Sequence, residues 1–236
     1  LEALGVDPRR VSVVPCGVDT EAFTPEGPAA PRTDTPRLLV IGRLVARKGL
    51  VDVLVALAQL PGAELVVVGG PGTEELCRDG AAAAVRDQAA GLGVSDRLRL
   101  VGRADRGEVA AWIRSSDIVV CAPWYEPFGI VPLEAMACGV PVVGTAVGGL
   151  MDTVVQGRTG LLVPPRCPDQ LAAALARLLA DPERRARMGA AGRARVVAAY
   201  DWREVARKTE INYRRIVRAA ARSGAAPRRA QGAVAP

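Results

Sequence analysis

Short runs of apolar, mostly β-branched residues alternate along the chain with longer stretches rich in Ala, Leu and Arg that have helical spacing. Continuous apolar runs are typical of parallel strands that helices cover on both faces. Strands alternating with helices predict an α/β fold, a Rossmann-like doubly wound parallel sheet. The predicted strands are residues 11–14, 37–41, 64–68, 97–101, 117–120, 140–143 and 160–163.

Polar capping residues mark where helices begin. Asp105 and Asp201 are each followed three positions later by a glutamate, which is a capping-box pattern, and Asp181 stands directly before a proline. The pattern after the last strand predicts a helical extension with helices at about 168–180, 182–199 and 201–222. Residues 223–236 are rich in Ala, Gly, Pro and Arg and are predicted to be disordered.

Composition excludes several classes of chemistry. The 236 residues can build one large core, and the absence of histidine means that Ser-His-Asp, Cys-His and zinc–histidine sites cannot be completed within the chain. Only 3% of the residues are aromatic, too few for a base-stacking nucleic-acid module. Five scattered cysteines without a Cys-x-x-Cys pair predict buried thiols in a reducing, cytoplasmic compartment and no metal site.

One uncharged stretch, residues 135–151, could be mistaken for a membrane span, but four glycines and a proline interrupt it. We therefore expect it to form buried core. The sequence opens at Leu1 in a loop-and-strand pattern, so we expect a piece of a longer protein.

The first candidate site follows the predicted strand 37–41. Ligands of doubly wound sheets bind beyond the carboxyl ends of the strands, where Gly42 allows close backbone approach. Arg43 and Lys48 could neutralise a phosphate from two directions, the first as a planar fork and the second as a point charge. The alternative is that both are solvated charges at a helix entrance. A second turn, at 68–72, is explained more simply as a glycine turn.

The second candidate site is a predicted helix N-terminus after the strand at 117–120. Proline is tolerated in a helix only in its first turn, so Pro132 places the start of this helix at 129–132. The free N–H groups there, from Ile130 and Val131, would form an anion site that the helix dipole reinforces. Glu126 precedes this helix and Glu134 lies about one turn inside it, so the two carboxylates would reach different parts of one ligand.

Taken alone, Glu134 could be a first-turn acid that the helix dipole favours. Taken together, an anion-binding helix start, two carboxylates and two cations from a neighbouring strand describe a receptor for a diphosphate joined to two polyols. A nucleotide-sugar has this chemistry.

A set of short segments occurs along the chain in a characteristic order: 15–19, 42–44 with 48–49, 68–70, 126–129 through 134–135, 139–143, 148–149, 157 and 159–160. With these segments, residues 5 to 200 resemble the C-terminal, donor-binding half of retaining GT-B fold glycosyltransferases, the large family (glycosyl transferases group 1) with two glutamates separated by seven residues. Cys16 and Asp152 depart from the residues usual in this family.

The resemblance implies a role for each matching residue. Arg43 and Lys48 would bind the donor diphosphate, with Gly42 giving room, and the backbone from Phe128 and Gly129 through Ile130 and Val131 would bind phosphate and sugar oxygens. Glu126 would bind the transferred sugar, Glu134 the ribose, and the segment ending at Arg103 the base. Glu126, Arg43 and Lys48 are thereby candidate catalytic residues, and no metal is implied.

The resemblance also implies a division of the chain. Residues 1–25 would connect to an N-terminal half that carries the acceptor site, 26–200 would bind a UDP-, GDP- or ADP-sugar, and 201–222 would form a helix crossing back to the missing half. The expected function is transfer of a sugar to a hydroxyl acceptor, with no prosthetic group and no turnover by this chain alone. A lipid acceptor would bring the whole enzyme to a membrane surface as a peripheral protein.

Several alternatives remain. The two glutamates could be a glycosidase pair, although that leaves Arg43 and Lys48 without a purpose. A noncatalytic nucleotide-sugar-binding or scaffold domain is the main alternative, and an epimerase of this fold would need further acids and histidines. The net charge of +6 could attract nucleic acid or a membrane, but the arginines lie beside acids along the predicted helices, and no nucleic-acid partner is expected.

Overall fold

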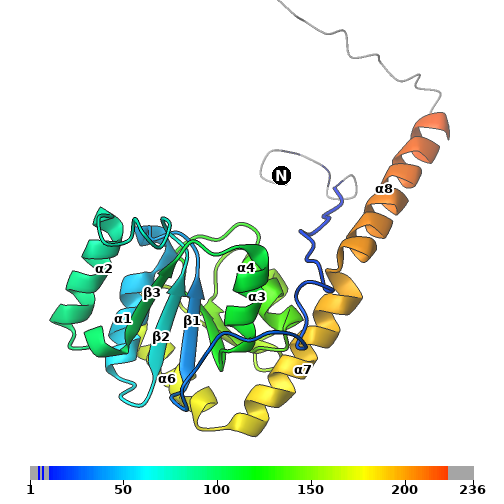
Figure 1. The fold of residues 1–236 in the computed structure, drawn as a ribbon. Helices are drawn as coiled ribbons and strands as arrows, with labels where there is room; N and C mark the ends of the chain where they lie inside the picture. The colour runs from blue at the N-terminus through cyan, green and yellow to red at the C-terminus, as the bar shows by residue number, and fades with distance from the viewer. Residues whose placement is uncertain (1–4, 6, 8–10, 223–236) are drawn as a thin grey trace, which may run out of the picture.

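A computed structural model describes residues 5, 7 and 11–222, and the predicted disordered tail lies outside these residues (Figure 1). Strands and helices alternate up to the last strand, and three helices follow it. The elements are β1 (Arg37–Ile41), η3 (Ala46–Lys48), α1 (Leu50–Ala58), β2 (Glu64–Val68), α2 (Gly80–Gly91), η4 (Ser95–Arg97), β3 (Leu98–Gly102), α3 (Arg106–Arg114), β4 (Ile118–Cys121), α4 (Ile130–Ala137), β5 (Val142–Thr145), α5 (Gly149–Thr153), β6 (Gly160–Val163), α6 (Pro168–Leu179), α7 (Pro182–Ala199) and α8 (Trp202–Arg222).

The described strands form one parallel sheet in the order β3-β2-β1-β4-β5-β6. The order reverses between β1 and β4, which pair through Leu38 with Ile118 and Leu39 with Val119. Loops that leave these two strands diverge to opposite faces, and a crevice opens between them at the carboxyl edge. This Rossmann-like α/β arrangement confirms the predicted fold class.

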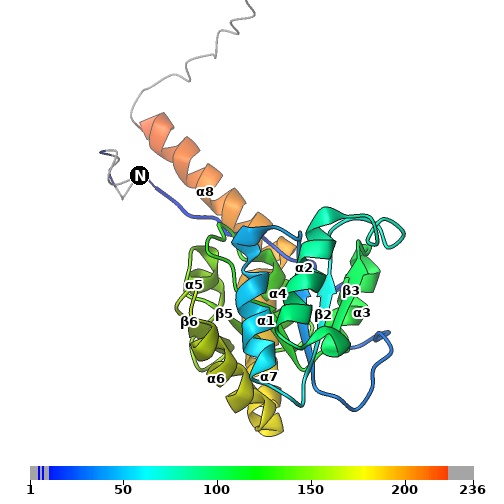
Figure 2. The same ribbon diagram turned by 90° about the vertical axis from the view of Figure 1, so that its left-hand side faces the viewer.

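Alternate side chains of β1 pack into two hydrophobic cores, one on each face of the sheet. Leu38 and Val40 pack with α1, α2 and α6, whereas Leu39 packs with α3, α4 and the end of α7. Figure 2 shows the helices α1, α2 and α6 in front of the sheet, with α4 behind it. Burial on both faces explains why the strands are continuous apolar runs in the sequence.

One predicted strand is wrong. Residues 11–14 form no strand, and Val13 and Val14 are exposed. A β-branched run needs a neighbouring strand to pair with, and this segment has none among the described residues; the chain is held a few residues later instead. There the Val18 N–H donates to the Tyr200 carbonyl at 2.8 Å, and the Trp202 N–H donates to the Val18 carbonyl at 3.3 Å.

Three other strands are shifted by one or two residues from their predicted bounds. The largest shift is at β5, which begins at Val142 rather than Val140. The Val140 N–H is used to close the preceding helix by donating to the Ala135 carbonyl at 3.0 Å, around Gly139 at φ 73°. The missing N–H of Pro141 then delays the ladder.

The predicted helix starts are all confirmed, and two of the three predicted caps form. Asp105 and Glu108 form a reciprocal capping box, with both bonds at 2.8 Å, and Asp181 accepts from the Arg184 N–H at 2.8 Å. The predicted box at Asp201 does not close, because the Glu204 carboxylate accepts hydrogen bonds from the Arg207 guanidinium at 2.6 and 2.8 Å.

No helix within the described residues is both long and apolar enough to cross a membrane.

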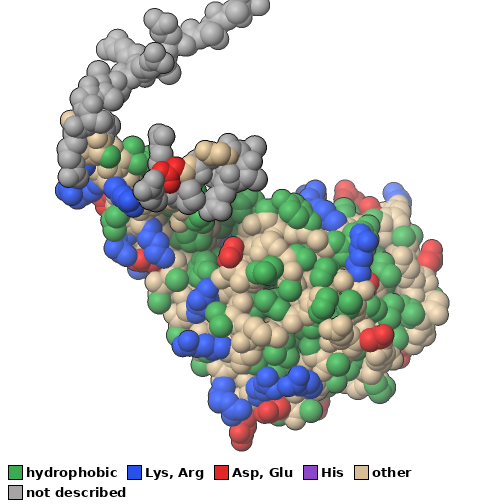
Figure 3. Space-filling view, turned by 180° about the vertical axis from the view of Figure 1, so that it is seen from behind, with side chains coloured by type: hydrophobic (Ala, Val, Ile, Leu, Met, Phe, Trp, Pro, Cys, Tyr) green, Lys and Arg blue, Asp and Glu red, His purple; other side chains and the backbone are tan. Residues whose placement is uncertain are grey.

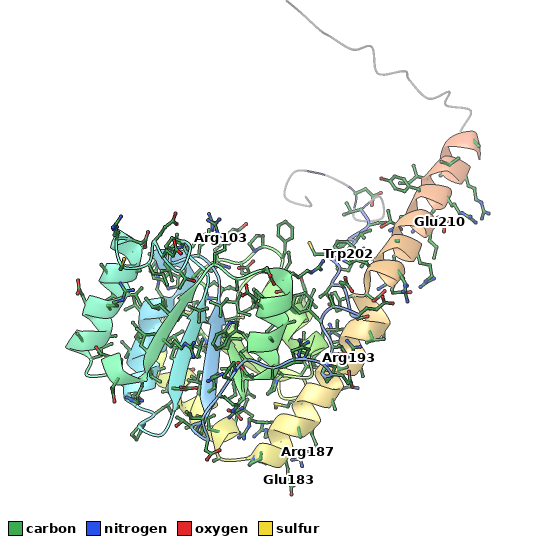
Figure 4. The ribbon with its side chains drawn as sticks, viewed as in Figure 1. Arg103, Glu183, Arg187, Arg193, Trp202 and Glu210 are labelled. Carbon is green, nitrogen blue, oxygen red and sulfur yellow. The ribbon has the colours of Figure 1, made fainter. Side chains whose placement is uncertain are left out.

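Arg193 on α7 (Figure 4) joins the segment 20–23, which precedes β1, to α4. Its guanidinium donates to the carbonyls of Thr20, Phe23 and Ala137 at 2.8–3.1 Å. Removing it leaves these carbonyls without their charged donor, so Arg193→Ala is expected to lower the free energy of unfolding by about 2–3 kcal/mol. Urea unfolding would measure this. The exposed Arg187→Ala on the same helix is the matched control, and an equally small loss in both variants would contradict the assignment.

Candidate functional site

The crevice between β1 and β4 contains a pocket with a volume of about 210 Å³. Its floor and walls are apolar and come from strand ends and from α1, α4 and α5. Its polar groups come from two connections at the carboxyl edge of the sheet, β1 to α1 and β4 to α4. The lining residues are Val40, Ile41, Gly42, Arg43, Leu44, Lys48, Leu50, Val67, Val120, Cys121, Ala122, Pro123, Glu126, Ile130, Val131, Pro132 and Leu150.

One end of the pocket is the N-terminus of α4. Gly129 precedes this helix in the left-handed conformation at φ 71°, and Pro132 lies in its first turn. Within the described chain, the N–H groups of Ile130 and Val131 have no hydrogen-bond acceptor. They are therefore available to a ligand, and the positive end of the helix dipole favours an anionic one.

Lys48 and Glu126 form an ion pair inside the pocket, with 2.6 Å between Nζ and Oε2. Their side chains are 22% and 16% exposed. Each residue is predicted from the sequence to bind a different part of a ligand, and their pairing is not predicted. Each therefore neutralises the other, and an incoming anion would compete with Glu126 for the ammonium group.

Arg43 lies at the pocket mouth, where its side chain is exposed and forms no hydrogen bond or ion pair to any described residue. Arg103 is outside the pocket lining, in the exposed loop after β3 (Figure 4). That loop is held by the Arg103 N–H, which donates to the Pro71 carbonyl at 2.8 Å. Phe128, 59% exposed, and Gly129 also lie outside the lining, between Glu126 and the start of α4.

Two consecutive glycines at the start of α5 hold the Glu126 loop in place. The Gly149 N–H donates to the Glu126 carbonyl at 2.8 Å. A Cβ atom on Gly148 would lie 2.2 Å from the same carbonyl oxygen, and one on Gly149 would lie 2.5 Å from the Phe128 carbonyl carbon. Only glycine permits this approach, which fixes where the Glu126 side chain begins.

Glu134 is half-buried on α4 and lies outside the lining of the pocket. Burial raises the pKa of its carboxyl group to about 7, against the opposing charge of Arg106. The group is therefore poised between its neutral and charged forms near neutral pH.

This raised pKa makes stability depend on pH. The folded protein holds the Glu134 proton more tightly than the unfolded chain does, so the free energy of unfolding should fall by about 2–3 kcal/mol as pH rises from about 4.5 to 7. Glu134→Gln should remove this component. Urea unfolding of both proteins at pH 5 and pH 7.5 would measure it, and parallel pH dependences would contradict the assignment.

Cys121 and Leu150 also line the pocket, although neither is among the residues predicted for the site. Cys121 ends β4, and burial raises the pKa of its thiol to about 12, so it stays neutral. Cys121 directly follows the predicted strand 117–120, so its position in the sequence could have placed it at the site. The position of Leu150 on α5 depends on tertiary packing, which the sequence pattern does not report. No group of His, Cys, Asp and Glu side chains within the described residues has the arrangement of a metal site.

Comparison with known proteins gives related sequences and folds. A D-inositol 3-phosphate glycosyltransferase of Frankia alni is 39% identical over 237 residues, which cover 94% of this chain and 57% of that relative. The sucrose-phosphate synthase of Thermosynechococcus elongatus is 36% identical with a TM-score of 0.77, covering 87% of this chain and 52% of that one. The HepE structure from Anabaena with UDP-glucose shares the fold at 23% identity and a TM-score of 0.72, over 85% of this chain and 56% of that one.

The sheet order and the pocket at its reversal point define a Rossmann-like α/β domain that matches GT-B glycosyltransferase structures. Residues 26–195 match the family Glycosyl transferases group 1, and this chain belongs to that family. It spans about half the length of the curated relatives that it matches.

Proposed function

We propose that this chain is the donor-binding half of a retaining, metal-independent glycosyltransferase that transfers a sugar from a nucleoside diphosphate to a hydroxyl acceptor. Family membership supports the class of reaction. The observation that carries the proposal is the convergence of Arg43, Lys48 and the free N–H groups of Ile130 and Val131 on one pocket. A diphosphate is the part of the donor that such a group of positive charges and dipoles recognises.

In this proposal the diphosphate displaces Glu126 from Lys48. The ammonium group then faces phosphate oxygens, Arg43 closes over them from the mouth, and the α4 N–H groups bind from the other side. Once released, the Glu126 carboxylate can accept hydrogen bonds from hydroxyls of the sugar. Breaking the Lys48–Glu126 pair thus frees Lys48 for the diphosphate and Glu126 for the sugar.

The remaining predicted contacts extend from this centre. Phe128 and Gly129 would contact the donor between phosphate and sugar, Glu134 would accept hydrogen bonds from the ribose, and the segment ending at Arg103 would meet the base. Gly42 would allow the phosphates to approach β1. HepE in its crystal binds UDP-glucose. This supports testing UDP first, with GDP and ADP beside it.

Catalysis would come from positioning and from stabilisation of the leaving diphosphate. As the glycosidic bond to phosphate breaks, negative charge develops on the diphosphate where Arg43, Lys48 and the α4 dipole are already oriented. The acceptor hydroxyl would attack from the same face that the diphosphate leaves, and its proton would pass to a leaving phosphate oxygen. This route retains the anomeric configuration.

Turnover would also need an N-terminal half that carries the acceptor site. Trp202, Tyr213, Ile216 and Val217 on α8 are each more than half exposed, and the helix extends away from the body (Figure 1). This uncovered apolar face supports its assignment as the crossing helix that the other half would cover. The chain alone is then expected to bind the donor without transferring the sugar.

The surroundings of the protein are also part of the proposal. All five cysteines are free, which supports a reducing, cytoplasmic setting. The prediction that the thiols are buried is confirmed only for Cys138, since Cys77 is exposed and the other three cysteines are partly exposed. On the face shown in Figure 3, Lys and Arg side chains lie scattered over the body, and those at its lower edge adjoin acidic ones. That dispersion supports a small-molecule ligand over nucleic acid, while a lipid acceptor would add peripheral membrane association.

Calorimetry on this chain tests the proposal. At least one of UDP, GDP and ADP should bind, and Arg43→Ala should weaken binding, whereas the exposed Arg158→Ala, on the turn before β6, should not. A chain that binds none of the three contradicts the proposal. A full-length protein that binds the donor but transfers sugar to no hydroxyl acceptor would support the noncatalytic alternative.

A further inference from the structure

Trp124 lies in the loop after β4, two residues before Glu126, and three parts of the chain hold it. Its backbone N–H donates to the Arg47 carbonyl at 2.9 Å. Its indole N–H donates to the Asp52 carboxylate on α1 at 3.3 Å. The Arg166 guanidinium covers its ring, with Cζ 4.2 Å from the ring centroid. The side chain is therefore fixed at its edge and on one face.

Arg166 has an unusual backbone conformation. At φ 57° it is the only residue other than glycine with a positive φ among the described residues. An L side chain is strained in this left-handed region. Strain of this kind persists where surrounding contacts hold the residue, and it clusters at functional sites. The contact of the Arg166 guanidinium with the Trp124 ring is one that glycine could not make.

The Trp124 loop leads directly into the polar centre of the pocket. Arg47 reaches the Tyr125 carbonyl at 3.4 Å, and its neighbour Lys48 pairs with Glu126. At the start of the loop, the Thr145 hydroxyl donates to the Pro123 carbonyl at 2.6 Å. Arg166 itself lies outside the pocket lining, and its contact with Trp124 links it to the loop that enters the pocket.

We propose that Arg166 and Trp124 form a positioning pair that fixes loop 123–126 so that Lys48 and Glu126 are presented to the donor. The inference rests on the proposed function only for the identity of the ligand. The guanidinium keeps the indole ring pressed toward α1, and the ring keeps the backbone of the loop against η3. Neither residue needs to touch the nucleotide-sugar.

Arg166→Gly separates this role from a purely structural one. Glycine relieves the left-handed strain, so the thermal midpoint should be unchanged or higher. The same change removes the cation over Trp124, so binding of the nucleoside diphosphate by calorimetry should weaken three- to tenfold. Arg158→Ala, which removes an exposed arginine from another loop, should change neither quantity. A stable Arg166→Gly protein with unchanged affinity overturns the proposal.

A double-mutant cycle tests whether the effect passes through the ion pair. In a Lys48→Ala background, Arg166→Gly should weaken binding of the nucleoside diphosphate less than twofold, because the Lys48 ammonium group that Arg166 helps to position is already gone. An equal loss in both backgrounds would mean that Arg166 acts on the ligand by another route and would overturn the proposal.

Hydrogen exchange gives a readout that needs no ligand. The Trp124 amide, bonded to the Arg47 carbonyl, should exchange about tenfold faster in Arg166→Gly than in the wild type or in Arg158→Ala. If the chain binds no nucleotide, the proposed function fails while this measurement still decides the positioning pair. Faster exchange supports the pair, and unchanged exchange overturns it.

Discussion

Lys48→Ala is expected to weaken binding of a nucleoside diphosphate by about 2–3 kcal/mol, or roughly 30- to 150-fold in Kd. The change removes a cation from the diphosphate and also leaves the Glu126 carboxylate unpaired in the pocket that the anion must enter. Calorimetry measures the effect. Lys208→Ala is the matched control. Lys208 is the only other lysine of the chain, and it donates to the Ala199 carbonyl on the helical extension, outside the pocket.

The ion pair makes this prediction sharper. Glu126→Gln alone should leave affinity for the nucleoside diphosphate unchanged or improved, because Lys48 no longer has to be released. Adding Glu126→Gln to Lys48→Ala should recover part of the lost affinity, because the repelling carboxylate is gone. If the double variant binds the nucleoside diphosphate more weakly than Lys48→Ala alone, Glu126 does not compete with the diphosphate for Lys48.

Gly148→Ala is expected to destabilise the protein by roughly 3–4 kcal/mol and to abolish measurable donor binding. The glycine has φ 44°, and the new Cβ atom would lie 2.2 Å from the Glu126 carbonyl oxygen. Backbone atoms cannot move aside as a flexible side chain can, so the Glu126 loop must shift. Urea unfolding and calorimetry together measure the two effects.

Gly157→Ala separates the clash from the conformational strain. Gly157 also has a positive φ, 75°, but a Cβ atom there would meet nothing within 4 Å. Its cost should be only that of placing alanine in the left-handed region, about 1 kcal/mol, with donor binding unchanged. Equal losses of stability in the two variants would show that the contact with Glu126 has no part in holding the loop.

The layered sheet was predictable because burial on both faces leaves a local trace. Each of the strands β1, β2 and β6 is a continuous apolar run after its first residue, and their predicted bounds are confirmed without a shift. Residues 11–14 have the same local character and form no strand. Whether a run becomes a strand depends on a free neighbour in the sheet, which periodicity does not report.

The candidate site was predictable as far as chain position determines it. The strand ends and Pro132 bring Arg43, Lys48, Glu126 and the start of α4 to one crevice once the sheet order is known. The Lys48–Glu126 pair could not be predicted, since it depends on how two loops approach across the edge of the sheet. The contact of Arg166 with Trp124 depends in the same way on the loops after β4 and β6.

Nuclear magnetic resonance of the ¹⁵N-labelled chain, titrated with UDP, GDP and ADP, tests the diphosphate site most directly. The amides of Ile130 and Val131, which have no acceptor among the described residues, should move downfield on saturation with a nucleotide that binds. Their shift should be lost in Lys48→Ala at the same nucleotide concentration. Saturable binding that leaves both amide resonances in place would contradict a diphosphate seated between Arg43, Lys48 and α4.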